Sequence, residues 1–170
     1  MATPTSLPAT FVAGNVLTAA QMNDLRGAFR ILQVVRATDG TDRSTTSTSF
    51  VDADISVTIT PTSSDSDIML VWSFSQGTQT SSGSNTRSRF QLTDSSNVAI
   101  AGAEEARIGP AGVTGFFFHY VTIVGYDSPA TTSATTYKGR FARATATDVV
   151  TVNIQNSNNT GQLFALEISA

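Results

Sequence analysis

Short segments that alternate apolar and polar residues follow one another from residue 31 to residue 169, and they constrain the fold of this chain most. The segment 86–94 is typical, because Phe90 and Leu92 fall on one face of an extended chain and two arginines fall on the other. No helical periodicity separates the segments, so about eight or nine of them predict a mainly β protein, an antiparallel and jelly-roll-like β-sandwich. The predicted strands are 31–38, 50–60, 67–76, 86–94, one short strand within 97–108, 115–126, 135–144, 149–155 and 162–169.

The segment GFFFHYVTIVGY (115–126) is apolar on both faces of a strand. In a sandwich the opposing sheet covers one face of such a strand, and we expect a neighbouring subunit to cover the other. Association of this kind also protects exposed sheet edges. The residues predicted to form the subunit interface are Phe117, His119, Val121 and Ile123.

The first 32 residues have a different pattern. Prolines near the N-terminus favour an extended arm, and Thr18 with Gln21 forms a capping box that predicts the start of a short α-helix. Apolar residues then recur every three to four positions as far as Leu32, which gives the helix one apolar stripe that needs a cover. We therefore predict an arm and helix over 1–32 that attaches to another surface, and a β-sandwich over 33–170. The residues predicted to make the attachment are Phe11, Val12, Leu17, Met22, Leu25 and Phe29.

The composition excludes several classes of function. The net charge is −3 and only 14% of residues are charged, so the chain lacks the basic cluster with which proteins bind nucleic acid. It contains no cysteine, which removes disulfides, thiolate metal sites and cysteine nucleophiles. No apolar run reaches the ~20 residues of a membrane span, and the first residues lack the features of a secretory signal. We therefore expect no nucleic-acid partner and no insertion into a membrane.

The sequence gives little support for catalysis or for a cofactor. His119 is the only histidine, and we expect it to be hydrogen-bonded within a sheet or an interface rather than to act as a base. No Gly-x-Ser-x-Gly motif accompanies it. Two pairs of alternating carboxylates could offer oxygen ligands to calcium: Asp52 with Asp54, and Asp65 with Asp67. We expect these carboxylates to be solvated instead. We predict that the chain is not an enzyme and holds no cofactor or metal.

Two arginines form the candidate ligand surface. Arg87 and Arg89 share a strand face, where they can form ion pairs between subunits or bind acidic sugars, although solvated strand surface is the stronger interpretation.

Trp72, the only tryptophan, is in phase with Ile68 and Leu70. This phase predicts a core side chain rather than a sugar-stacking one.

The opening PATFVAGNVLTAAQMN (8–23) combines an aromatic-x-Ala-Gly turn with a Leu-Thr-Ala-Ala helix, and it resembles the start of many minor structural proteins of tailed bacteriophages. The next stretches, ILQVVRATD, TSFVDADISVTITP and SDIMLVWSF, resemble the start of the small β-domain of phage fibre, tip and decoration proteins. The closing stretches YKGRFARA, VTVNIQ and GQLFALEIS resemble the last strands of the same domain. Together these stretches cover most of the chain.

The resemblance implies a structural protein of a virion, often a homotrimer, that is attached by its N-terminal segment to other virion proteins of the capsid or tail. Tail fibre, tail tip and capsid decoration remain open within this interpretation. The alternative is a carbohydrate-binding adhesin that recognises a glycan of the host envelope. We expect an adhesin to bind through loops such as 77–86 or 127–134.

Overall fold

The computed structural model describes residues 31–80, 87–109, 115–144, 150–157 and 159–169, together with Gly14, Val16 and Ala19. Within these ranges the chain is built from β-strands that follow the predicted segments closely. The strands are β1 (Ile31–Asp39), β2 (Arg43–Thr45), β3 (Val51–Ile59), β4 (Asp67–Thr80), β5 (Ser88–Asp94), β6 (Ala106–Ile108), β7 (Gly115–Asp127), β8 (Thr135–Arg143), β9 (Val150–Ile154) and β10 (Gly161–Ile168).

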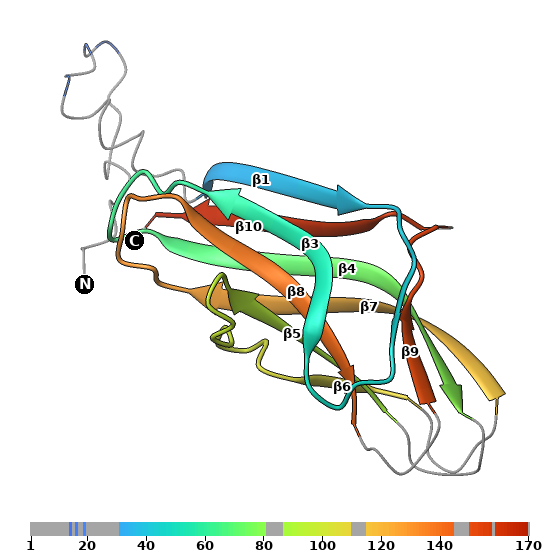
Figure 1. Cartoon of the computed structure of the whole chain (residues 1–170). Helices are drawn as coiled ribbons and strands as arrows, with labels where there is room; N and C mark the ends of the chain where they lie inside the picture. Colours follow the sequence, from blue (N-terminus) through green and yellow to red (C-terminus); the bar gives the residue numbers. More distant parts are fainter. Residues whose placement is uncertain are drawn as a thin grey trace.

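The strands form two antiparallel sheets that face each other (Figure 1). Sheet A has the order β1-β10-β4-β9-β2, with β7 on the other side of β4, and sheet B has the order β3-β8-β5-β6. Because β10 and β9 pair with successive parts of β4, and β1 and β2 pair with β10 and β9, sheet A has four strand positions. When β1 with β2 counts as one strand and β9 with β10 counts as another, the described part of the chain has eight strands. In this count, sheet A contains strands 1, 8, 3 and 6, and sheet B contains strands 2, 7, 4 and 5. This is the connectivity of a jelly roll, so the predicted fold class is confirmed.

The core lies between the two sheets and is centred on aromatic side chains. Trp72 is 1% exposed and stacks on Phe74 with ring centroids 4.1 Å apart, and Phe90 of sheet B lies 4.8 Å from Phe74. Gly139 on β8 makes room for the indole, because a Cβ atom there would lie 2.7 Å from Trp72 Cζ2. The predicted core position of Trp72 is therefore confirmed. Each large apolar side chain buried in this way contributes about 1.5–3 kcal/mol of stability.

One buried carboxylate joins sheet A to the connection between β3 and β4. Glu167 on β10 accepts a hydrogen bond from Gln33 Nε2 at 2.6 Å, and both the backbone N–H and the hydroxyl of Thr62 donate to it at 2.7 Å. Burial raises the pKa of this carboxyl, but the hydrogen bonds outweigh burial and lower the pKa of Glu167 below its ordinary value of 4.5. The ionised carboxylate therefore stabilises the fold.

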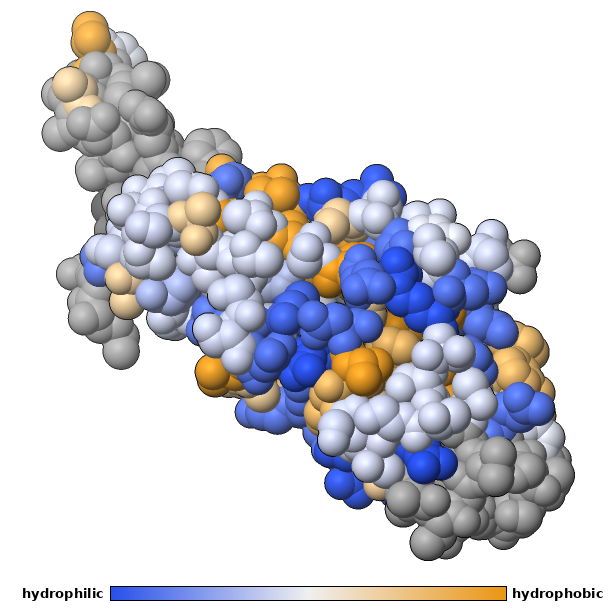
Figure 2. Space-filling model, in the orientation of Figure 1, coloured by the Kyte–Doolittle hydropathy of each residue, from blue (hydrophilic) through white to orange (hydrophobic). Residues whose placement is uncertain are grey.

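The outer face of sheet B is polar and its charges are paired. Asp52 on β3 accepts hydrogen bonds from Lys138 Nζ at 3.1 Å and from Arg140 Nε at 2.8 Å on β8. Arg89 on β5 donates to Glu105 through Nε at 2.9 Å. Figure 2 shows the molecule from this side, where hydrophilic and intermediate colours cover most of the surface and hydrophobic colours form small separate areas.

The structure differs from the predicted element bounds in three respects. The polar stretch 39–49, predicted as a loop, contains the short strand β2, which pairs with β9. Strand β4 continues to Thr80 rather than ending at residue 76, because β7 and β9 pair with its second half. Leu32, predicted at the end of the helical stripe, lies in β1.

Candidate functional site

The residues predicted to attach the chain to another surface lie outside the described residues, so the attachment remains a prediction. They are Phe11, Val12, Leu17, Met22, Leu25 and Phe29. The described part of the chain starts its first strand at Ile31, which pairs with Ile168 and is 55% exposed. The polypeptide therefore enters the jelly roll at one end of sheet A.

The predicted subunit interface on β7 is wrong for two of its four residues. Val121 and Ile123 are buried in the core of the same chain, so they cannot contact another subunit. Phe117 and His119 continue the same row, but Phe117 is half-buried and His119 is exposed, so their part in an interface stays a prediction. Both rows of this strand are apolar, and the pairing of β7 with β4 decides which of them faces sheet B. The exposed large side chains of the opposite row are Phe116, Phe118, Tyr120, Val124 and Tyr126.

The outer face of sheet A carries a continuous apolar area across β1, β10, β4 and β7. Cross-strand partners share a face, so the strand register places these side chains in two adjacent rows. Neighbouring strands lie about 4.8 Å apart, so four of them make an area roughly 15 Å wide. We call this area the apolar patch; its residues are Val34, Met69, Val71, Val124, Tyr126, Phe164 and Leu166.

Two charged side chains border the apolar patch. Arg36 on β1 holds its guanidinium 5.8 Å from the centre of the Phe164 ring. Asp67 on β4 accepts a hydrogen bond from the Tyr126 hydroxyl at 2.6 Å and another from Ser128. The hydrogen bond to Asp67 raises the pKa of Tyr126. The patch therefore has a positive group on one side and a negative group on the other.

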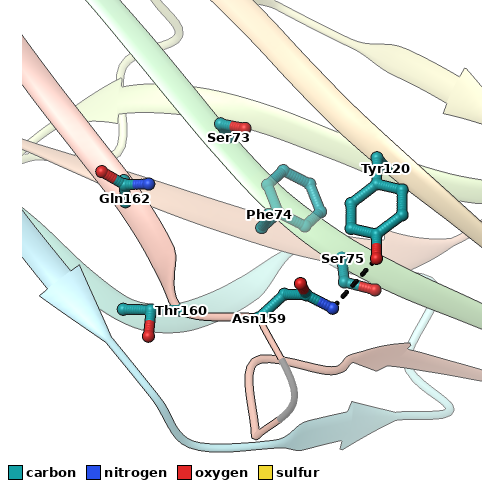
Figure 3. A pocket seen from close by; sticks show the side chains of 7 residues that line it. All are labelled: Ser73, Phe74, Ser75, Tyr120, Asn159, Thr160 and Gln162. Atoms are coloured by element: carbon teal, nitrogen blue, oxygen red, sulfur yellow. Dashed lines mark hydrogen bonds between the residues drawn. The ribbon is translucent and has the colours of Figure 1, made fainter.

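A pocket of about 310 Å³ lies next to the apolar patch on the same face of sheet A. Strands β4, β7 and β10 and the connection between β9 and β10 form its walls (Figure 3). None of its lining side chains is charged. The lining residues are Ser73, Phe74, Ser75, Tyr120, Asn159, Thr160 and Gln162.

Tyr120 and Asn159 extend toward one another from opposite walls of this pocket (Figure 3). Asn159 Nδ2 donates a hydrogen bond to the Tyr120 hydroxyl oxygen at 3.0 Å. Tyr120 is nevertheless 78% exposed, whereas Ser75 below it is buried. We call this site the Tyr120 pocket; it combines an exposed aromatic ring with amide and hydroxyl groups.

The Tyr120 pocket could not be predicted from the sequence. Residues 156–161 have a turn composition, and the alternation of β7 gives Tyr120 a strand position without revealing its neighbours. The pairings of β4 with β7 and with β10 bring Tyr120 beside residues about 40 positions later in the chain. Only the order of strands in sheet A could have predicted this meeting.

His119 is hydrogen-bonded within the sheet, as predicted. Its Nδ1 accepts a hydrogen bond from Gln76 Nε2 at 2.9 Å, and Gln76 is its register partner on β4. The fully buried Gln76 carbonyl in turn accepts hydrogen bonds from Thr78 at 2.9 Å and Ser88 at 3.1 Å. The imidazole contacts an amide rather than a carboxylate, which is the arrangement of a structural histidine.

The two arginines of the predicted ligand surface have different surroundings. Arg89 is paired with Glu105, and its guanidinium lies 4.6 Å from the centre of the Phe50 ring. Burial opposes ionisation of Glu105, but Arg89 and Arg107 outweigh it and lower the pKa of this carboxyl. Arg87 precedes β5 and is exposed. The pairing of Arg89 favours a structural role over ligand binding.

Three of the four alternating carboxylates, those of Asp52, Asp54 and Asp67, are bound to cationic or hydroxyl groups. Asp52 pairs with Lys138 and Arg140, and Asp54 accepts from Arg43 Nε at 2.9 Å. Another pocket, of about 290 Å³, includes Asp52, Asp54 and Lys138 in its lining. No group of three or more His, Cys, Asp or Glu side chains suited to a metal ion occurs in the described part of the chain.

No protein-family model matches the chain, and no curated protein matches it. Among solved structures, the chain is similar to a mutant VP2 protein of infectious bursal disease virus in derived T=1 particles, with 13% identity and a TM-score of 0.39. It is also similar to the VP2 subviral particle of that virus, with 11% identity and a TM-score of 0.39. The matches cover 81% of this chain but only 36% and 38% of those proteins. The fold class of this chain rests on its own strand order.

Across the described residues, no helix has the length and apolar character needed to cross a membrane.

Proposed function

We propose that this chain is a non-enzymatic structural component of a bacteriophage virion, either a tail fibre or tip protein or a capsid decoration protein. In this proposal three copies associate through the apolar patch, and residues 1–32 attach the trimer to another virion protein. The observation that carries the proposal is the apolar patch itself. The sequence resemblance to phage structural proteins supports the same assignment.

The apolar patch supports association because it leaves large side chains in water on a fold that already has a complete core. Val34, Val124 and Tyr126 are 54%, 48% and 45% exposed. Contiguous apolar areas of this kind mark binding surfaces in soluble proteins. An interface of standard size buries about 800 Å² per partner around an apolar centre, and the patch provides such a centre.

The charges at the border favour a second copy of this chain as the partner. Arg36 and Asp67 lie on strands at different positions across the patch and have opposite signs. Copies related by rotational symmetry can therefore place the arginine of one beside the aspartate of the next. Because Ile31 lies at the same end of sheet A, this association also brings the first residues of β1 in the copies toward one another.

The proposed attachment is tested on purified phage particles that carry Phe29→Asp. A charge in the apolar stripe removes the chain from the particle while the isolated protein keeps its β-sandwich, as measured by mass spectrometry and circular dichroism. Val16→Asp is the control, because this residue lies outside the stripe. Normal incorporation of the Phe29 variant contradicts the proposed attachment.

The position in the particle follows from the copy number of the chain relative to the major capsid protein, measured by quantitative mass spectrometry. A ratio of tens of per cent indicates capsid decoration, and a few copies per particle indicate a tail protein. Absence of the chain from purified particles contradicts the proposed function itself.

A further inference from the structure

We propose that the Tyr120 pocket is a binding site for a neutral carbohydrate, with one pyranose ring seated against Tyr120. This inference goes beyond the proposed structural role, and it does not depend on association through the apolar patch. It places the adhesin alternative on different residues from the loops expected from the sequence. Three features of the pocket support it: an aromatic surface, polar groups and the absence of charge in the lining.

The aromatic surface comes from the outward row of β7. Tyr120 is 78% exposed and Phe118, two residues earlier on the same face, is 63% exposed. The C–H groups on one face of a pyranose ring are apolar, so they pack on an exposed aromatic ring while the sugar hydroxyls remain free for hydrogen bonds. Phe118 offers a second aromatic surface next to the pocket, where a second sugar unit of the same chain can pack.

The polar groups around Tyr120 are the types that bind sugar hydroxyls. Asn159 and Gln162 supply amides, which donate and accept, and Ser73 and Thr160 supply hydroxyls. Asn159 Nδ2 donates to the Tyr120 oxygen, so the Tyr120 proton can be donated to a sugar oxygen. The hydrogen bond also holds the tyrosine ring in place before binding, which reduces the entropy lost on association.

The chemistry of the lining selects an uncharged ligand. None of the seven residues of the Tyr120 pocket carries a charge. The pocket on sheet B differs, because Asp52 and Lys138 line it and pair with each other at 3.1 Å. An acidic sugar entering the Tyr120 pocket would lose water from its carboxylate without gaining a cationic partner from the lining. We therefore infer a neutral glycan rather than a sialylated or uronic one.

The volume and shape suit a weak site used in several copies. A pocket of about 310 Å³ is at the small end of the range for ligand sites, which fits one sugar unit rather than a buried oligosaccharide. Affinity for such a ligand is expected to be about millimolar per site. Several linked copies raise the apparent affinity without any new contact.

The test is the affinity of the full chain for neutral and acidic trisaccharides, measured per site by NMR titration. The probes are maltotriose, mannotriose, chitotriose and trigalacturonic acid. We expect saturable binding of at least one neutral trisaccharide, with shifts centred on Tyr120 and Asn159, and no binding of the acidic one. The inference is overturned if none of the neutral probes shows saturable binding. It is also overturned if trigalacturonic acid binds more tightly than the neutral probes.

Variants of Tyr120 and Asn159, on the two walls of the pocket, test whether the glycan binds in the Tyr120 pocket. Tyr120→Ala is expected to weaken binding by about ten-fold, the scale of one lost aromatic anchor. Tyr120→Phe keeps the ring and loses only the hydroxyl, so it should have a smaller effect, and Asn159→Ala removes the opposite wall. Val98→Ala is the control, because it truncates a side chain that is 62% exposed and lies outside both the Tyr120 pocket and the apolar patch.

Each variant is first checked by thermal unfolding, so that a folded protein is compared in every case. Equal affinity of wild type, Tyr120→Ala and Asn159→Ala overturns the site. A loss in Val98→Ala as large as that in Tyr120→Ala also overturns it. Because affinity is measured per site, dissociation of a trimer does not change the measured affinity. Failure of the proposed assembly is therefore distinguished from failure of this inference.

Discussion

The outer faces of the two sheets are built from the same alternating strands but have opposite surface chemistry. On sheet B, the long charged side chains pair with one another, as Asp52 does with Arg140 and Arg89 does with Glu105. On sheet A, two rows of apolar side chains cross four strands, and the charged Arg36 and Asp67 lie at the border. Sheet B therefore satisfies its own polar groups, whereas sheet A exposes apolar area that a partner can cover.

The outer face of sheet A is itself divided into an apolar and a polar region. The apolar patch occupies the end at which Ile31 enters the fold, and the polar rows with the Tyr120 pocket follow it along the strands. The proposed association through the first region would leave the second region available to the proposed ligand. One sheet can thus serve assembly at one end and recognition in the middle.

The largest expected effect is the loss of association on placing a charge in the apolar patch. Val124→Asp buries an unpartnered carboxylate at the interface, which costs about 3–5 kcal/mol and weakens association by a hundred-fold or more. Light scattering after size-exclusion chromatography should show a monomer. Thr58→Asp on the outer face of sheet B is the control and should leave the trimer intact; a monomer from both variants contradicts the distinction between the faces.

The core lies between the two sheets that carry these outer faces. Gly139→Ala tests how tightly this core is packed. The added methyl group meets the Trp72 indole at 2.7 Å, so we expect a loss of about 1–3 kcal/mol in the free energy of unfolding. Denaturant unfolding measures the change. Gly40→Ala is the matched control, because nothing lies within 4 Å of the added atom, and an equal loss in both variants contradicts the proposed contact.

Glu167→Gln tests the buried link that sheet A makes to the β3–β4 connection. Removing the charge weakens the hydrogen bonds from Thr62 and Gln33, with an expected loss of about 1–3 kcal/mol at neutral pH. The pKa of Glu167 is lowered in the folded state, so its contribution is present above the ordinary value of 4.5 and is lost as the pH falls through the folded value.

The stability difference between wild type and Glu167→Gln should therefore shrink below pH 4.5. Chemical unfolding at several pH values measures it. A difference that stays constant down to the acid transition argues that Glu167 is not ionised in the folded protein.

The smallest effect is expected on sheet B. Asp52→Asn removes the partner of Lys138 and Arg140, yet the Asp52 side chain is 45% exposed, so the loss should be below about 1 kcal/mol. High salt should reduce it further. Thermal unfolding at two salt concentrations checks this, and a loss larger than that of Glu167→Gln would contradict the view that this face contributes little to stability.

The strands could be predicted from the sequence because alternation is a local property. In β3, for example, exposed polar residues and buried apolar residues alternate from Asp52 to Ile59, as the apolar pattern indicates. The assignment of the two rows of β7 could not be predicted, because both are apolar and the choice depends on the register that sets Val121 opposite Phe74. The same limit applies to the Tyr120 pocket, whose walls come from strands that are distant in the sequence.

Association through the apolar patch is tested most directly by hydroxyl-radical footprinting of the wild-type protein and of Val124→Asp, read residue by residue with mass spectrometry. We predict that Met69 and Tyr126 in the apolar patch are protected in the wild type and reactive in the variant. Tyr120 should be reactive in both. Equal reactivity of Met69 and Tyr126 in the two proteins would contradict association through this face.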